Sequence, residues 1–157
     1  MIPFLNVLQY LALVLWVGSM FGFGVLYAPV LFGSLSSREQ AGSIAGDTLA
    51  RIDTMGLVTG GIMLVITALQ AIDSHFASID LGRLLNAAVM LGLVILSATT
   101  IRQRLNAVRS KLGRPIDEIP EGDPVRREYG RAHALSRALF TVNMLLGCLL
   151  IGLSALR

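Results

Sequence analysis

Charged residues are scarce in this chain, and so are the residues that build cross-links and metal centres. Asp, Glu, Lys and Arg make up 15% of its 157 residues, whereas an ordinary soluble domain has about 25%. The one cysteine, Cys148, excludes an internal disulfide and any all-cysteine metal site. There are only two histidines, His75 and His133, and no Cys-x-x-Cys or His-Glu-x-x-His pattern. The sequence therefore lacks the marks of a soluble metalloenzyme.

Long apolar stretches take the place of the missing charge. Four of them approach the ~20 residues that a helix needs to cross a ~30 Å hydrocarbon core. Only helices or closed barrels satisfy their backbone in lipid, and these runs of Leu, Val, Ile, Gly and Ala favour helices. The predicted spans are residues 5–29, 53–72, 83–102 and 135–156, with connections at 33–52, 73–82 and 103–134. We predict an all-α fold in which residues 1–157 form a single transmembrane domain, an antiparallel up-down four-helix bundle.

Basic residues lie almost entirely on one side of this predicted bundle. Of 13 Lys and Arg, 11 fall in or beside the connections 33–52 and 103–134, and only Arg83 and Arg157 lie on the other side. Lys and Arg near span ends favour the cytoplasmic face. We therefore expect both termini outside, in a plasma membrane such as the inner membrane of a bacterium. The basic connection is expected to attract anionic lipid, with an acidic protein partner as the alternative.

Local patterns predict where the helices begin and bend. Pro29 predicts a kink or a stop near the end of the first span. Ser36 and Glu39 have the spacing of a capping box, which favours a short amphipathic surface helix ahead of the second span. Asp123 before Pro124 predicts the N-cap of a fourth helix that begins outside the membrane. The third helix is expected to continue past the bilayer as a basic amphipathic extension.

Glycines on the first two spans are spaced for close helix packing. Gly18 and Gly22 are one helical turn apart, and so are Gly56 and Gly60. Such spacing lets helix backbones approach each other in a membrane. We expect these glycines to pack helices within the bundle, with a homodimer contact as the alternative.

The polar residues inside the predicted spans are mostly uncharged. No Asp, Glu, Lys or Arg is predicted deep inside a span, which argues against a proton relay or an ion-coupled transporter. Interhelical hydrogen bonds would account for most of the rest. Asn143 stands out because an amide near the middle of a bundle needs a partner or a ligand. His133, at the mouth of the same span and three residues before Ser136, is a candidate proton-sensitive or anion-binding group.

Two kinds of metal centre can be weighed. His75 and His133 would lie a bilayer thickness apart, which argues against a bis-histidine haem within one chain. A soft-metal path is a weaker alternative, because thioethers and thiolates suit Cu(I). It would use one methionine near mid-depth of each helix and a neighbouring cysteine: Met20, Met63, Met90, Met144 and Cys148. Methionine also fills gaps in apolar cores, and we expect no bound metal or cofactor.

Five short segments together resemble a known family of small membrane proteins. They are Trp16-Val-Gly-Ser, Ala28-Pro-Val-Leu-Phe32, Asn106-Ala-Val-Arg109, His133-Ala-Leu-Ser136 and Asn143-Met-Leu-Leu-Gly147. The family they resemble is domain of unknown function 4149, described as transmembrane-protein-205-like. The resemblance covers almost the whole chain and implies four transmembrane helices with no established activity, substrate or cofactor. By position it points to seven candidate residues: Trp16, Pro29, Phe32, Arg109, His133, Ser136 and Asn143.

The chain departs from that family pattern at one place. The resemblance implies a proline near the end of the third span, where this sequence has Ile101-Arg-Gln-Arg104. The course of the third helix at this point is therefore a question for the structure.

Three functions are compatible with the sequence. The first expectation is a non-enzymatic accessory or structural subunit, which packs against a larger membrane complex or against a second copy of itself. It is favoured by the small-residue faces of the first two spans and by the expected lack of buried charge. The alternative is a permeation protein for a small solute or a soft, copper-like cation. A membrane enzyme or haem protein is disfavoured by the isolated histidines, and we expect no nucleic-acid partner.

Overall fold

The computed structural model describes residues 2–112, 118–120 and 122–156; Arg114 and Arg157 lie outside this part. The described chain is helical almost throughout. Its helices are α1 (Ile2–Phe21), α2 (Ala28–Ser34), α3 (Arg38–Asp73), α4 (Ser78–Leu96), α5 (Arg102–Leu112) and α6 (Pro124–Ala155). Two π-helical turns, η1 (Gly22–Tyr27) and η2 (Ser97–Ile101), join α1 to α2 and α4 to α5 without a break. The result is four continuous helical rods.

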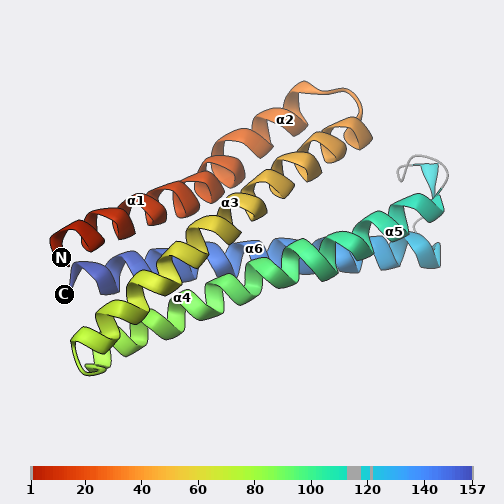
Figure 1. The fold of residues 1–157 in the computed structure, drawn as a ribbon. Helices are drawn as coiled ribbons and strands as arrows, with labels where there is room; N and C mark the ends of the chain where they lie inside the picture. Colours follow the sequence, from red (N-terminus) through yellow and green to blue (C-terminus); the bar gives the residue numbers. More distant parts are fainter. Residues whose placement is uncertain (1, 113–117, 121, 157) are drawn as a thin grey trace.

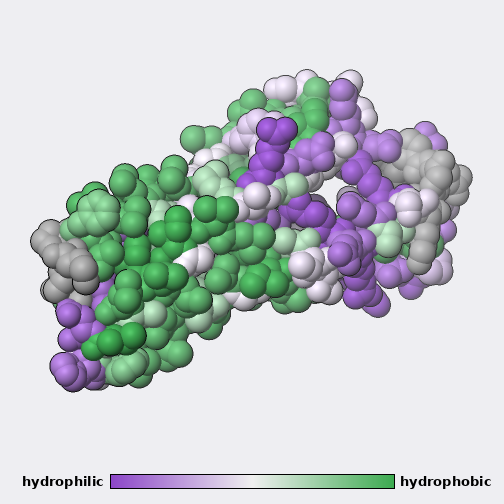
Figure 2. Space-filling view, viewed as in Figure 1, coloured by the Kyte–Doolittle hydropathy of each residue, from purple (hydrophilic) through white to green (hydrophobic). Residues whose placement is uncertain are grey.

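All four rods are long and apolar enough to cross a membrane, which confirms the predicted all-α membrane bundle. With 36 residues, α3 is ~54 Å long at a rise of ~1.5 Å per residue. The 32 residues of α6 give ~48 Å. A hydrocarbon core is only ~30 Å thick, so both helices extend well beyond it. Figure 2 agrees: apolar surface covers much of the length, and polar surface lies at the two ends, with the larger area at one of them.

The rods pack together over part of their length and separate at one end (Figure 1). Both termini and the turn between α3 and α4 lie at the packed end, which we call the termini end. At the opposite end, the arm end, the chain divides into two arms (Figure 1). One arm is α2 with the first half of α3, and the other is α5 with the first turns of α6. The up-down order of the helices is the predicted one.

The first arm begins at a π-helical turn that Pro29 explains. In η1 the Ala28 N–H bonds to the Phe23 carbonyl, five residues earlier. A proline has no N–H, and its ring clashes with the carbonyl four residues before it in a regular α-helix. A wider turn relieves this clash, and the helix then continues to Ser34. The kink or stop predicted at Pro29 is therefore a widened turn within a continuous rod.

The second arm also begins at a π-helical turn, here without a proline. In η2 the Arg102 N–H bonds to the Ser97 carbonyl. Within the same turn, Thr99 Oγ1 donates a hydrogen bond to the Ile95 carbonyl (2.7 Å). A side-chain contact of this kind often bends helices. The third rod then continues as α5 to Leu112, which confirms its predicted extension.

The second rod is simpler than the sequence suggested. The expected surface helix and the second span form one unbroken helix, α3, because no proline interrupts the backbone hydrogen bonds between them. Its N-cap is Ser37, whose Oγ accepts a hydrogen bond from the Gln40 N–H (3.2 Å), so the predicted capping box at Ser36 is one residue early. Asp123 caps α6 as predicted and accepts a hydrogen bond from the Val125 N–H (2.7 Å).

Candidate functional site

A buried guanidinium, that of Arg83 on α4, lies at the termini end. The residue is 1% exposed. Its Nη1 donates to Asp80 Oδ1 (2.7 Å), one turn earlier on the same helix, in a buried ion pair. Its Nη2 donates to the side-chain oxygens of Gln9 on α1 (2.6 Å) and Gln70 on α3 (2.8 Å). Its Nε donates to Ser154 Oγ on α6 (3.4 Å), so one side chain contacts all four rods.

Neutral polar side chains extend this contact. Gln9 Nε2 donates to Ser154 Oγ (2.8 Å), and Gln70 Nε2 donates to Asn6 Oδ1 (2.9 Å). The Tyr10 hydroxyl donates to the Ser154 carbonyl (3.0 Å). We call this set the Arg83 network: Asn6, Gln9, Tyr10, Gln70, Asp80, Arg83 and Ser154. The bonds from Arg83 to Gln9, Gln70 and Ser154 join the four rods at this end. Removing one partner of the buried ion pair typically costs about 3–5 kcal/mol, because it leaves an uncompensated buried charge.

The expectation that the bundle buries no charge is wrong at this end, where Asp80 and Arg83 are both buried. From the sequence Asp80 is expected in the connection 73–82 and Arg83 beside it at the end of a span, yet both lie in α4 and are buried. A lone arginine at a span end is ordinarily solvated, so periodicity alone does not indicate its burial. The available signal was the pair of amides inside apolar spans, Gln9 and Gln70, which need partners from other helices.

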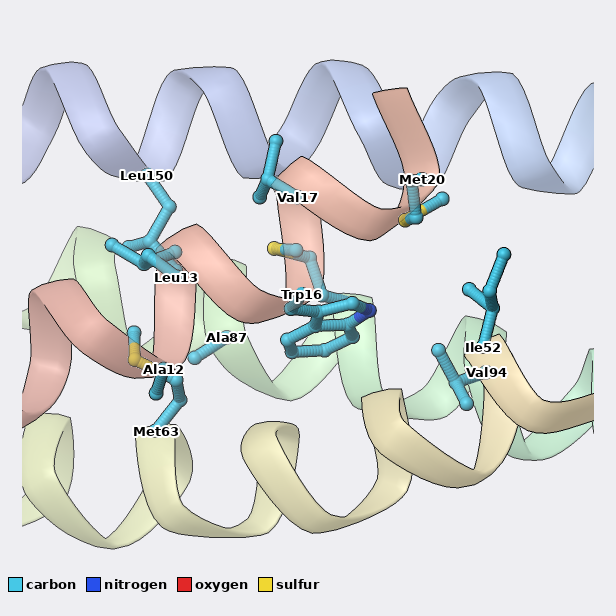
Figure 3. Packing of buried hydrophobic residues seen from close by; sticks show 11 residues of the cluster. Ala12, Leu13, Trp16, Val17, Met20, Ile52, Met63, Ala87, Val94 and Leu150 are labelled. Atoms are coloured by element: carbon cyan, nitrogen blue, oxygen red, sulfur yellow. The ribbon is translucent and has the colours of Figure 1, made fainter. Parts of the chain in front are cut away.

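Trp16 fills the centre of the bundle and is 1% exposed. In Figure 3 its indole extends from α1 toward α3, with Val94 of α4 nearby. A Cβ added at Gly56 would lie 2.8 Å from the indole Nε1, and one added at Gly60 would lie 2.9 Å from two ring carbons. These distances are too short for real contacts. The two glycines of α3 therefore leave the space that the indole occupies.

The glycines of α1 do not have this role. A Cβ added at Gly18 or Gly22 would meet no heavy atom of the described residues within 4 Å beyond its own helix backbone. Gly18 is exposed and Gly22 is half-buried. The expected packing within the bundle is therefore not found at this pair, because the opposite face of α1, with Trp16, points inward.

Two buried amides lie between the Arg83 network and the indole. Asn143 is 4% exposed and Asn86 is 8% exposed. Asn143 Nδ2 donates to the Met90 carbonyl (3.4 Å), but neither Asn143 Oδ1 nor Asn86 Oδ1 accepts a hydrogen bond from any described residue. An unsatisfied buried acceptor costs about 1–3 kcal/mol. Asn143 was predicted from the sequence to need a partner, whereas nothing distinguished Asn86 from the other polar residues of the spans.

A polar cleft separates the two arms (Figure 2). At its base Asp53 Oδ2 accepts hydrogen bonds from Arg102 Nη2 (2.5 Å) and Ser97 Oγ (3.3 Å), which joins α3 to the start of α5. Near the arm tips Arg109 Nη2 donates to the Glu39 carbonyl (3.1 Å). The arms are thus joined at both ends of the cleft, and charged groups lie on each side of it.

The candidate polar residues from the sequence do not form one site. His133 is exposed, and its ring stacks on Tyr129 one turn earlier (centroids 6.0 Å apart, planes at 4°). Ser136 is half-buried on the same helix. Asn143 lies ten residues beyond His133, which is ~15 Å along α6. Arg109 belongs to the cleft.

The sulfur-bearing residues separate into two groups. Met20, Met63 and Met90 are buried in the core around Trp16, and Met144 packs against it. Cys148 is exposed and is not part of that core. The methionines therefore fill the interior as gap-filling residues do. Among the described residues no group of three or more His, Cys, Asp or Glu could hold a metal ion.

Comparison with known proteins yields one finding. A sequence profile described as domain of unknown function (DUF4149) matches residues 11–113, which include Trp16 with Gly56 and Gly60, the Asp80–Arg83 ion pair and the Asp53–Arg102 pair of the cleft. No curated protein and no solved structure matches the chain.

Proposed function

Because the chain belongs to the family of the domain of unknown function DUF4149, whose description assigns no activity, we propose a function from the geometry alone. The protein is a non-enzymatic membrane protein that lets a small uncharged polar solute permeate. Its conformation is open at the arm end and closed at the termini end. The observation that carries the proposal is the order of polar and apolar groups along the bundle.

This order can be followed along the third rod, which consists of α4, η2 and α5. From the termini end its inward residues are the Asp80–Arg83 pair, then Asn86, then Met90 opposite Asn143. Val94 beside Trp16 follows, and the last are Ser97 and Arg102 at the base of the cleft. From the arm end inward, the polar cleft is thus followed by the apolar residues around Trp16, then by the two amides, and last by the Arg83 network. This is the order expected of a path that is closed both at Trp16 and at the Arg83 network.

Charge along this path favours a neutral solute. Arg83 is paired with Asp80, and Arg102 is paired with Asp53, so each end contributes a cation with its anion. The amides between them are uncharged. Between these two ion pairs an ion would meet no net opposite charge, which is the usual means of admitting it.

An accessory subunit is the second candidate, and the arms favour it. Residues 102–137 hold nine Lys and Arg against five Asp and Glu, and the helices extend well past a hydrocarbon core. Such a basic projection suits an acidic partner or anionic lipid. The candidate ranks second because one of its supports, the expected lack of buried charge, is contradicted by the buried Asp80–Arg83 pair. Under either candidate, we propose that the basic arms face the cytoplasm and the termini face outward.

Purified protein in sealed lipid vesicles tests permeation. In a hyperosmotic solute the vesicles shrink, then reswell as the solute enters, and light scattering records the rate. We expect faster reswelling than in protein-free vesicles for urea and glycerol, and no difference for sucrose and sodium chloride. Protein-free rates for all four solutes would contradict permeation. Recovery from native membranes in a fixed ratio with another membrane protein would then support the accessory role.

A further inference from the structure

Two buried side-chain acceptors in the bundle interior, Asn86 Oδ1 and Asn143 Oδ1, have no hydrogen-bond donor among the residues that the structure describes. We propose that these two amides form a site that accepts hydrogen bonds from a small uncharged solute between the two ends of the bundle. This inference rests on the proposed permeation function and names the residues and the solute chemistry on which it depends.

Both amides lie along the line where α4 and α6 face each other. Two contacts fix this line: Arg83 Nε to Ser154 Oγ, and Asn143 Nδ2 to the Met90 carbonyl. Asn86 comes three residues after Arg83 and four before Met90, so it shares their face of α4. It is buried there, about one helical turn from the level of Asn143.

The surroundings select the chemistry of the ligand. Each amide oxygen can accept up to two hydrogen bonds. The neighbouring buried residues Ala87, Met90 and Leu150 are apolar, and the buried charged residues of the described chain are Asp80 and Arg83, which pair with each other. An unpaired ion is strongly disfavoured in such surroundings. A neutral N–H or O–H donor satisfies the oxygens at no such cost, and urea, with four N–H donors, is a suitable probe.

A resident water molecule offers the same donor chemistry as a passing solute, and substitution separates the two. Leucine is close to asparagine in size but has no polar atom. If the oxygens serve a passing solute, the protein without solute bears the cost of unsatisfied acceptors, and Asn→Leu removes that cost. If they hold a structural water, Asn→Leu removes hydrogen bonds that stabilise the fold.

The experiment compares Asn86→Leu, Asn143→Leu and the native protein in two measurements, urea entry into vesicles and the thermal midpoint in detergent. Asn106→Leu, at an exposed amide on α5, is the matched control. We expect urea entry to fall about tenfold or more in both test variants. We expect the midpoint to stay level or to rise by about 2–4 °C. The control should match the native protein in urea entry and in midpoint.

The possible contrary results separate a failure of the amide site from a failure of the permeation function. Native urea entry in both test variants would overturn the amide site and leave the permeation function standing. A lowered midpoint with native urea entry would identify a structural water and overturn the site as well. No entry through the native protein would overturn the permeation function and the site with it. If Asn143→Leu fails to fold because the bond to the Met90 carbonyl is lost, Asn86→Leu decides, since no described residue bonds to its oxygen.

Discussion

At the scale of single residues, the fit of Trp16 against α3 determines how closely three helices approach. Trp16 is an interior aromatic from α1, and its ring lies where the side chains of Gly56 and Gly60 would be. Glycine is needed here for space, because both positions are regular α-helix. Cores packed in this way tolerate little added volume.

Replacing Gly60 with alanine should therefore destabilise the protein. The added Cβ would lie 2.9 Å from two indole carbons and 3.0 Å from Leu91 Cδ1, so the ring must move. We expect a loss of about 1–3 kcal/mol, seen as a lower thermal midpoint. Gly61→Ala is the control, since its Cβ meets nothing within 4 Å and alanine favours a helix. Equal midpoints for the two variants would contradict the fit of Trp16.

Single residues also show what the sequence could reveal about the site. Asn143 was identifiable because an amide inside an apolar helix needs a hydrogen-bond partner or a ligand. The Arg83 network was not, because it needs partners from all four rods whose rotations a single sequence does not give. Asp53 and Arg102, at predicted span boundaries, resemble ordinary flanking charges until the arms bring them together.

At the scale of elements, the two arms are the least integrated part of the molecule. Each begins at a π-helical turn, and such turns frequently occur at functional sites. Each arm has buried residues of its own: Ala41 and Ala45 in the first, Val108 and Ala132 in the second. Polar contacts across the cleft, including the one from Arg109 to the Glu39 carbonyl, oppose their separation.

Removing the Arg109 side chain should widen the cleft at its tips. Spin labels on Gln40 and Ser110, both exposed, report the distance between the arms once Cys148 is replaced by serine. We expect Arg109→Ala to give a longer and broader distance distribution in pulsed EPR. Arg104→Ala is the control, because Arg104 contacts Glu128 within one arm (3.6 Å). Unchanged distances in Arg109→Ala, or equal changes in both variants, would contradict the bridging role.

The elements themselves were largely predictable. Four spans, the N-cap at Asp123 and the extension of the third helix all follow from local patterns that the structure confirms. The single helix α3 did not follow, since an amphipathic segment and an apolar span can join or break without a proline to decide. The widened turn at Pro29 is a third outcome between the predicted kink and stop, set by the backbone around the proline.

At the scale of the whole molecule, the two ends of the bundle differ in access. The termini end is closed by buried hydrogen bonds among all four rods, and the arm end opens into a polar cleft (Figure 2). Trp16 and the apolar core separate the two ends. The proposed permeation function depends on this asymmetry, which a uniformly packed bundle would lack.

Cysteine labelling tests this asymmetry most directly. Starting from Cys148→Ser, Ser97→Cys places a thiol at the base of the cleft, Ser154→Cys places one in the Arg83 network, and Ser110→Cys gives a fully exposed reference. Each is exposed to a membrane-impermeant maleimide in vesicles opened to both sides. We predict labelling of Ser97→Cys at a rate approaching that of the reference and protection of Ser154→Cys. Labelling of Ser154→Cys as fast as Ser97→Cys would contradict the closed end.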